Sequence, residues 1–301
     1  MPDTLDPRRH PYRADLAAES LRGRVEAPRY VEGELRQVGG GAAPLWSRPD
    51  ASRGWASQVL HGETVRVYEA KDGWAWVQAE RDGYVGYVPA DALSAEVVPP
   101  SHRVSVPGTF VYAEPDAKAL TGLHLGLNAL VRVVETGAAP GLGFARLADG
   151  GFVPVRHLAE LPAFALDFVA VAERLVGAPY VWGGKTRLGF DCSGLVQAAM
   201  HAAGLDCPRD SDMQMAELGT PVEVRGDPAG LRRGDLVFWT GHVGILTDAA
   251  TLLHANAYHM AVAAEPLEGA VERIARSGSA IAAIKRLEPR TAQQQRVRAA
   301  E

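Results

Sequence analysis

The sequence predicts an α+β domain preceded by two small all-β units. Apolar residues at helical spacing cover residues 164–176, and a second helical run over 193–203 stops at Gly204, a plausible C-cap. After Gly234 the chain changes to short β-type runs, so helices come first and an antiparallel sheet comes after them. Residues 38–154 consist of short β-type runs separated by Gly, Asp and Pro, which is typical of small all-β units.

The all-β region contains an internal duplication. Val65-Arg66-Val67 and Tyr87-Val88-Pro89 recur as Val131-Arg132-Val133 and Phe152-Val153-Pro154, a shift of 65 or 66 residues. Each copy is short for an independent barrel, so we expect the copies to pack against each other or against the α+β domain. The predicted organisation is an N-terminal arm (1–32), a first β unit (33–98), a second, degenerate β unit (99–162), a catalytic domain (163–288) and a flexible tail (289–301).

Composition excludes several classes of protein. A net charge of −5 over 301 residues offers no basic surface for nucleic acid. No window approaches the roughly 18 consecutive apolar residues of a spanning helix, so no membrane partner is expected. The first ten residues do not resemble a secretory signal, and we expect a cytoplasmic protein. Two cysteines and nine scattered histidines form no metal-binding pattern, so we expect neither a metal nor another cofactor.

Cys192 is the candidate nucleophile. Asp191 is a natural N-cap, which places Cys192 at a helix start where the helix dipole favours a thiolate. A cysteine at a helix start is by itself more often structural. His242 and His254 change the balance, because two antiparallel strands joined by a turn near Asp248 would bring a base and its orienting partner together.

Six ordered motifs then give a specific resemblance. They are Tyr180-Val181-Trp182-Gly183-Gly184, residues 190–196 around Asp191-Cys192-Ser193, Pro208-Arg209-Asp210-Ser211, residues 231–238, residues 241–245 around His242, and Leu253-His254-Ala255. In this order the chain resembles the NlpC-type cell-wall cysteine peptidases, which have a papain-like α+β core. The β units resemble bacterial SH3-like barrels, the first more than the second. The resemblance implies that Cys192 is the nucleophile, His242 the general base and His254 the residue that orients it.

Relatives with SH3-like domains also imply a substrate. They cleave the γ-D-glutamyl to diamino-acid bond of murein peptides, some only when the N-terminal L-alanine is free, which suits recycling of small peptides in the cytoplasm. The residues that the resemblance assigns to substrate are Tyr84, Tyr180, Asp191, Ser193, Asp210 and Ser211.

Other interpretations stay open at this point. Tyr180 could be a core aromatic. Asp191 and Asp210-Ser211 could each mark the start of a helix and have no role in substrate binding. The competing functions are a cell-wall amidase or thiol acyltransferase of the same fold, and a non-catalytic murein-binding protein. The preferred diamino acid and the oligomeric state are left undetermined.

Overall fold

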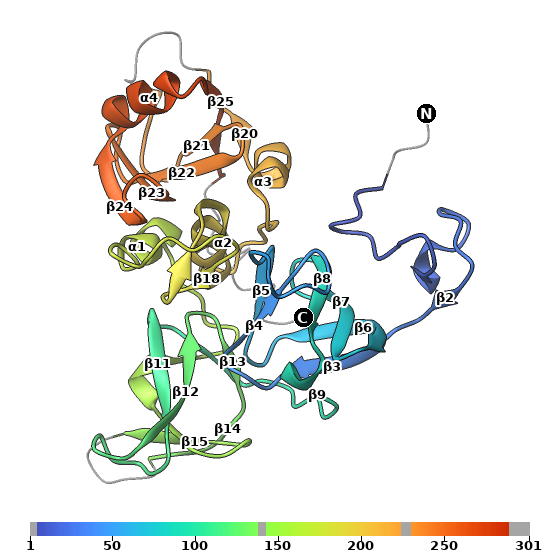
Figure 1. Cartoon of the computed structure of the whole chain (residues 1–301). Coiled ribbons are helices and arrows are strands. Elements are labelled where there is room, and N and C mark those ends of the chain that lie inside the picture. The colour runs from blue at the N-terminus through green and yellow to red at the C-terminus, as the bar shows by residue number, and fades with distance from the viewer. Residues whose placement is uncertain (1–4, 138–142, 224–229, 289–301) are drawn as a thin grey trace. The chain divides into compact units, whose positions relative to one another are not determined.

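The computed structural model describes residues 5–137, 143–223 and 230–288, and the predicted tail at 289–301 lies outside them. The chain divides into two compact units, Met1–Leu158 and Ala159–Glu301 (Figure 1). No helix in the described ranges is long and apolar enough to cross a membrane. Each unit is described in turn.

The first copy of the duplicated β region has one five-stranded sheet and one hairpin. The sheet order is β8-β7-β6-β3-β9, and strand β4 pairs with β5. An isolated bridge between Trp46 and Tyr87 connects the hairpin to β8. The bounds are β3 (Glu34–Val38), β4 (Ala42–Leu45), β5 (Ser57–Leu60), β6 (Thr64–Lys71), β7 (Trp74–Ala79), β8 (Val85–Pro89), the 3-10 helix η2 (Ala90–Ala92) and β9 (Leu93–Ser94).

The second copy repeats this element order. Its bounds are β10 (His102–Val104), β11 (Gly108–Tyr112), β12 (Thr121–Gly126), β13 (Leu130–Val131), β14 (Val133–Thr136), β15 (Phe144–Leu147), β16 (Phe152–Pro154), the 3-10 helix η3 (Val155–His157) and β17 (Leu158–Glu160). The long strand β6 corresponds to two short strands here, β13 and β14, so the hydrogen bonds divide into sheets β13-β10-β17 and β12-β11-β16-β15-β14. Among the described residues the ladders do not close in either copy, so the predicted barrels are open sheets.

The two copies contact each other, as expected from their small size. The backbone N–H of Leu130 donates to the carbonyl of His61 at 2.8 Å. Gly62 has φ +75°, and a Cβ at that position would lie 2.1 Å from the Leu130 carbonyl oxygen. Only glycine therefore allows the two backbones to approach this closely.

The N-terminal segment, which was predicted to be an arm, contributes buried side chains to the hydrophobic core of the first copy. It contains β1 (Ala17–Ala18), the 3-10 helix η1 (Glu19–Leu21) and β2 (Tyr30–Val31), which is parallel to β1. Leu16 is fully buried and packs in one cluster with Tyr68, Trp76 and Val85. The Arg13 guanidinium lies 4.5 Å from the centroid of the Trp76 ring, a cation–π contact.

Unit 2 has helices on an antiparallel sheet. The helices are α1 (Phe168–Glu173), α2 (Cys192–Ala202), α3 (Ser211–Glu217) and α4 (Leu267–Arg276). The sheet order is β20-β25-β21-β22-β23-β24. The strands are β20 (Thr220–Pro221), β21 (Leu236–Trp239), β22 (His242–Leu246), β23 (Thr251–Asn256), β24 (Ala261–Pro266) and β25 (Ile281–Arg286), and a small hairpin joins β18 (Lys185–Thr186) to β19 (Gly189–Phe190).

The two helices predicted at the start of unit 2 are present, with one correction. Helix α2 ends as expected, since Gly204 comes after it with φ +70°. Helix α1 is shorter than predicted because the Asp167 side chain accepts from the Val169 backbone N–H at 2.8 Å and caps the helix there. Leu166, which the apolar pattern placed inside the helix, lies before the cap and is 86% exposed.

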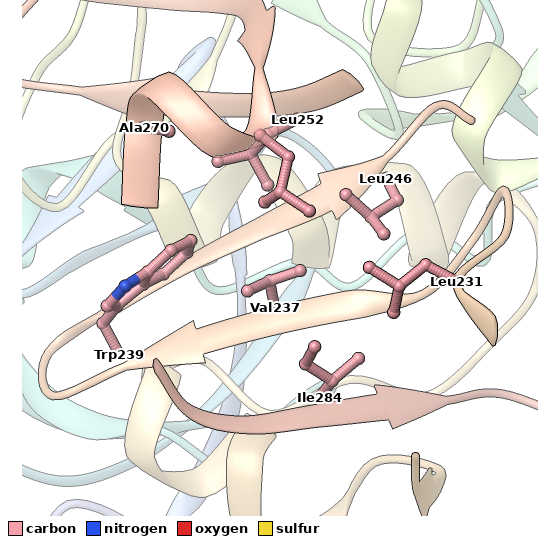
Figure 2. Close-up of a cluster of buried hydrophobic side chains, with 8 residues drawn as sticks. Leu231, Val237, Trp239, Leu246, Leu252, Ala270 and Ile284 are labelled. Carbon is pink, nitrogen blue, oxygen red and sulfur yellow. The ribbon is translucent and has the colours of Figure 1, made fainter. Parts of the chain in front are cut away.

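Helix α4 was not predicted, although its apolar residues recur at the spacing of one helix face. Leu267, Ala270, Val271 and Ile274 have the i, i+3, i+4, i+7 pattern. Figure 2 shows side chains of the sheet, such as Trp239, converging with Ala270. The cluster comprises Leu231, Val237, Trp239, Leu246, Leu252, Leu267, Ala270 and Ile284. Burial of this stripe against the sheet is what stabilises α4.

Replacing Leu16 with Ala tests whether the N-terminal segment belongs to the core of unit 1. The leucine is fully buried, so removing its side chain should lower the free energy of unfolding by about 2–5 kcal/mol. Leu35→Ala is the matched control, because Leu35 is 40% exposed and should change stability by less than about 1 kcal/mol. Guanidinium unfolding followed by tryptophan fluorescence measures both. Equal, small effects would mean that the segment is only laid on the surface.

Candidate active site

Cys192 is the first residue of α2, because Asp191 is the N-cap at which this helix begins. The Asp191 carboxylate accepts from the Gly194 backbone N–H at 2.7 Å, and the backbone at Asp191 is extended with φ −94°. The thiol is largely enclosed, with Cys192 8% exposed. The cap therefore places the Cys192 thiol at the N-terminus of α2, which is the positive end of the helix dipole.

Asp191 does more than cap the helix, because it forms a buried ion pair with Arg209. The guanidinium Nη1 donates to Oδ1 at 3.0 Å and Nη2 donates to Oδ2 at 2.6 Å, while Arg209 is only 1% exposed. The Gly183 backbone N–H adds a bond to Oδ2 at 2.8 Å, and the Ser193 hydroxyl accepts from Nη1 at 2.8 Å. Sequence reasoning quoted Arg209 within a motif without assigning it this role.

The ion pair changes the expected electrostatics of substrate binding. The resemblance assigns Asp191 to substrate binding, and a carboxylate without a counter-ion would attract the free ammonium of the substrate. Arg209 already compensates the Asp191 charge, and five donors, among them the Ser193 hydroxyl at 3.3 Å from Oδ1, fill the acceptor capacity of the two oxygens. Asp191 therefore acts first as a structural anchor, and little net negative charge is left there for a ligand.

The structure brings His242 and His254 together. Strands β22 and β23 are antiparallel, and His242 Nε2 lies 2.8 Å from His254 Nδ1. The register Ile245–Leu253 puts Gly244 directly opposite His254, so the two rings meet along a diagonal. A Cβ at Gly244 would lie 3.2 Å from the His254 Cβ and 2.6 Å from Leu252 Cδ1. Glycine at 244 thus leaves the space in which His254 approaches His242.

His254 has a second partner that sequence reasoning missed. Its Nε2 lies 2.8 Å from Glu265 Oε1, and the same carboxylate contacts the Arg273 guanidinium of α4. On β24, Ala263 lies opposite His254. Glu265, two residues further along β24, is therefore the diagonal neighbour of His254 on the same face of the sheet. The only sequence signal was a charged residue directly after a small-residue run at 261–264 and before a proline.

Cys192 lies next to the strand that carries His242, since the backbone N–H of Val243 lowers the thiol pKa as a hydrogen-bond donor. Burial has the larger effect and, with the Asp191 charge, raises the pKa of Cys192 to about 11. Burial, followed by the neighbouring His254, lowers the pKa of His242 to about 3. The sequence led us to expect a depressed thiol pKa. In the enclosed site burial is the largest effect on both groups, so it favours a neutral thiol and a neutral imidazole at rest.

Tyr180 is close to the thiol. It forms a β-bridge with Phe190, two residues before Cys192. Burial, with the nearby Cys192 and Asp191 as further causes, raises the pKa of Tyr180 to about 12. Its hydroxyl therefore stays protonated and can donate a hydrogen bond.

The remaining predicted residues occupy two different places. Asp210 is the N-cap residue of α3 and Ser211 its first residue, and both are half-buried in unit 2. Tyr84 precedes β8 in unit 1, is 6% exposed, and its backbone N–H donates to Asp82 Oδ1 at 3.1 Å. A contribution of Tyr84 to the site around Cys192 stays a prediction.

One cluster has potential metal ligands. His254, His259 and Glu265 each offer one ligand atom, and these atoms lie within 4.8 Å of one another. The Arg273 guanidinium already neutralises Glu265 there, and His254 bonds to His242 and to Glu265. We interpret the cluster as a hydrogen-bond chain.

This arrangement of a helix-start cysteine beside a histidine pair on an antiparallel sheet defines a papain-like cysteine hydrolase. Comparison with known proteins agrees. Residues 177–274 match the NlpC/P60 family, and residues 45–93 match the bacterial dipeptidyl-peptidase SH3 domain. The chain therefore contains an NlpC/P60 domain and a bacterial SH3 domain, and it is a cysteine peptidase.

Similar proteins include two bacterial peptidases and one solved structure. The chain is 28% identical over 223 residues to the gamma-D-glutamyl-L-lysine dipeptidyl-peptidase of Bacillus subtilis, covering 66% of this chain and 71% of that one. It is 26% identical over 235 residues to dipeptidyl-peptidase 6 of Lysinibacillus sphaericus, covering 71% and 84%. The crystal structure of an NlpC/P60 family protein from Bacillus cereus shares the fold, with a TM-score of 0.69 at 22% identity over 85% of this chain and 100% of that one.

Replacing Arg209 with Met tests how much the ion pair between Asp191 and Arg209 contributes to the free energy of unfolding. The variant leaves the Asp191 carboxylate buried without its counter-ion, which should lower the free energy of unfolding by about 3–5 kcal/mol. Arg232→Met is the control, because Arg232 is exposed and should change stability by about 0.5 kcal/mol or less. Denaturant titration monitored by circular dichroism compares them. A loss no larger than the control's would show that Asp191 does not need its partner.

Proposed function

We propose that the chain hydrolyses the γ-D-glutamyl to diamino-acid bond of small murein peptides whose N-terminal L-alanine is free. The observation that carries this proposal is the placement of Cys192 at the start of α2, in contact with Val243, the strand neighbour of His242 in the His242–His254 pair. The name of the Bacillus subtilis relative, a gamma-D-glutamyl-L-lysine dipeptidyl-peptidase, supports this type of bond. A role in recycling such peptides in the cytoplasm, without nucleic acid or membrane as partner, is part of the proposal.

In the first half of the reaction Cys192 is the nucleophile and His242 the base. Because both groups are neutral at rest, the thiol proton moves to His242 as the sulfur attacks the γ-carbonyl carbon. His242 then gives this proton to the leaving amine of the diamino acid, and a thioester remains on Cys192. In the second half, water gives a proton to His242 and attacks the thioester. The dipeptide L-Ala-γ-D-Glu is released and the thiol regains its proton.

The oxyanion that forms on the γ-carbonyl needs donors. The backbone N–H of Cys192 points from the open end of α2, where the first N–H groups have no partner within the helix. The Tyr180 hydroxyl is the second donor, since its raised pKa keeps it protonated throughout. Together they stabilise the charge that develops in the transition state.

Recognition of the free N-terminus is assigned to Asp191, Ser193, Asp210 and Ser211, with Tyr84 from unit 1 helping to select the peptide. Since Arg209 compensates Asp191, the ammonium of L-alanine requires a further acceptor. Asp210, the N-cap residue of α3, is half-buried and is the other acidic residue of this group. The amine is therefore held by several weak acceptors.

The competing functions are an amidase or acyltransferase of the same fold and a non-catalytic murein-binding protein. The former would use the same cysteine and histidines on another bond, so only substrate analysis separates them. A binding protein does not require the Cys192, His242 and His254 set.

A digest of defined murein peptides tests the substrate. We expect L-Ala-γ-D-Glu to be released from a tripeptide ending in meso-diaminopimelate or L-lysine. Acetylating the alanine should lower the rate by about 100-fold or more, because it removes the charge of the ammonium and the hydrogen bonds that this group donates to its acceptors. Mass spectrometry of the products measures both. Equal cleavage of free and acetylated peptides would refute the requirement for a free N-terminus, and cleavage of a different bond would favour an amidase.

Replacing Cys192 with Ala tests the nucleophile. The variant should lose all measurable turnover, because no other group can form the thioester. Cys207→Ala is the matched control, since Cys207 is also a buried cysteine of unit 2 that forms no disulfide. It should keep activity close to that of the wild type when both variants show the same circular dichroism spectrum. Turnover by the Cys192 variant would show that the nucleophile is another residue.

A further inference from the structure

We propose that Glu265 is a positioning residue that fixes the protonation pattern of both active-site histidines. This inference rests on the proposed roles of Cys192 and His242. It comes from a continuous chain of contacts, in which His242 Nε2 lies 2.8 Å from His254 Nδ1 and His254 Nε2 lies 2.8 Å from Glu265 Oε1.

The charge of Glu265 decides the direction of the hydrogen bonds in this chain. Its carboxylate contacts the Arg273 guanidinium of α4, and the hydrogen bonds from Arg273 and His254 hold the pKa of Glu265 below its usual value against the opposing effect of burial. An ionised carboxylate can only accept hydrogen bonds. The proton in its contact with His254 must therefore sit on His254 Nε2.

The protonation of the two rings is then determined by elimination. Burial lowers the pKa of His254, so its ring is neutral and carries a single N–H. With that proton on Nε2, the Nδ1 atom of His254 is an acceptor, and His242 must donate to it from Nε2. His242 is also neutral, so its Nδ1 atom bears a lone pair. Nδ1 is the one ring nitrogen left to receive the thiol proton of Cys192.

Glu265 also favours the reaction electrostatically without taking up a proton. When the thiol proton moves from Cys192 Sγ to His242 Nδ1, His242 becomes an imidazolium, and His254 and Glu265 keep their protonation. Arg273 lowers the pKa of His242, and the negative charge of Glu265 raises it by a smaller amount. The carboxylate thus opposes the burial that makes His242 a weak base.

A purely structural role for Glu265 is the alternative, because its contact with Arg273 joins β24 to α4. Arg273 also stacks on Tyr258, with its guanidinium carbon 4.2 Å from the ring centroid. The charged and titratable groups around this chain come from several elements. They are Cys192 and its N-cap Asp191 at the start of α2, His242 of β22, His259 of the loop after β23, and Arg273 of α4.

The decisive experiment measures the histidine tautomers and the thiol reactivity, and neither requires a substrate. Long-range ¹H–¹⁵N NMR of the full chain at pH 7 should show His242 and His254 each protonated on Nε2 and not on Nδ1. In Glu265→Gln the amide can donate as well as accept, so His254 should become a mixture of tautomers. Alkylation of Cys192 by iodoacetamide should be about tenfold slower at pH 7, by analogy with the loss that follows removal of a carboxylate partner from a metal-bound histidine.

Two further variants separate positioning from anchoring. Glu268→Gln makes the same charge change at an exposed position of α4 and should alkylate at the wild-type rate. Arg273→Gln removes the link to α4 but keeps the carboxylate, so it should keep the wild-type tautomers and should not slow alkylation. Unchanged tautomers in Glu265→Gln, or an equal slowing in Arg273→Gln, would overturn the proposal. Wild-type tautomers and reactivity as predicted, combined with no murein peptide cleavage, would refute the proposed substrate and leave the role of Glu265 intact.

Discussion

The catalytic unit depends on the buried ion pair between Asp191 and Arg209. Its two bonds of 2.6 and 3.0 Å join the start of α2 to the segment that leads into α3, and the bond from Gly183 ties in the loop before the β18–β19 hairpin. Three stretches of chain are thereby fixed around one cysteine. A buried carboxylate is tolerated there only because every oxygen is satisfied.

The same enclosure determines the chemistry. Burial raises the pKa of Cys192 and lowers that of His242, so charge separation at rest is unfavourable. A neutral pair needs a base with a defined free lone pair and a way to stabilise the imidazolium when it forms. The chain from His242 through His254 to Glu265 supplies both. Helix α4 is connected to the site through Arg273, in addition to its packing on the core.

Unit 1 shows how a duplicated sequence can diverge in hydrogen bonding while keeping its element order. In the first copy, Trp46 and Trp74 pack edge to face at 5.2 Å between ring centroids, and Tyr68 lies 5.6 Å from Trp76. The second copy has Phe144 against Tyr112 and no tryptophan. The N-terminal segment packs into the core of the first copy through Leu16, so the copies are stabilised differently.

The sequence alone determined the α+β class, the duplication, the capped start of α2 and the residues Cys192, His242 and His254, because caps, periodicity and ordered motifs are local signals. It missed the partners that only register and packing define. Glu265 reaches His254 across a strand pair, and α4 places Arg273 against it. Burial, which no local pattern reports, reversed the expected direction of the Cys192 pKa, and tertiary packing gave Asp191 a counter-ion. These are long-range contacts, and their energies depend on the surrounding dielectric and on neighbours distant in sequence.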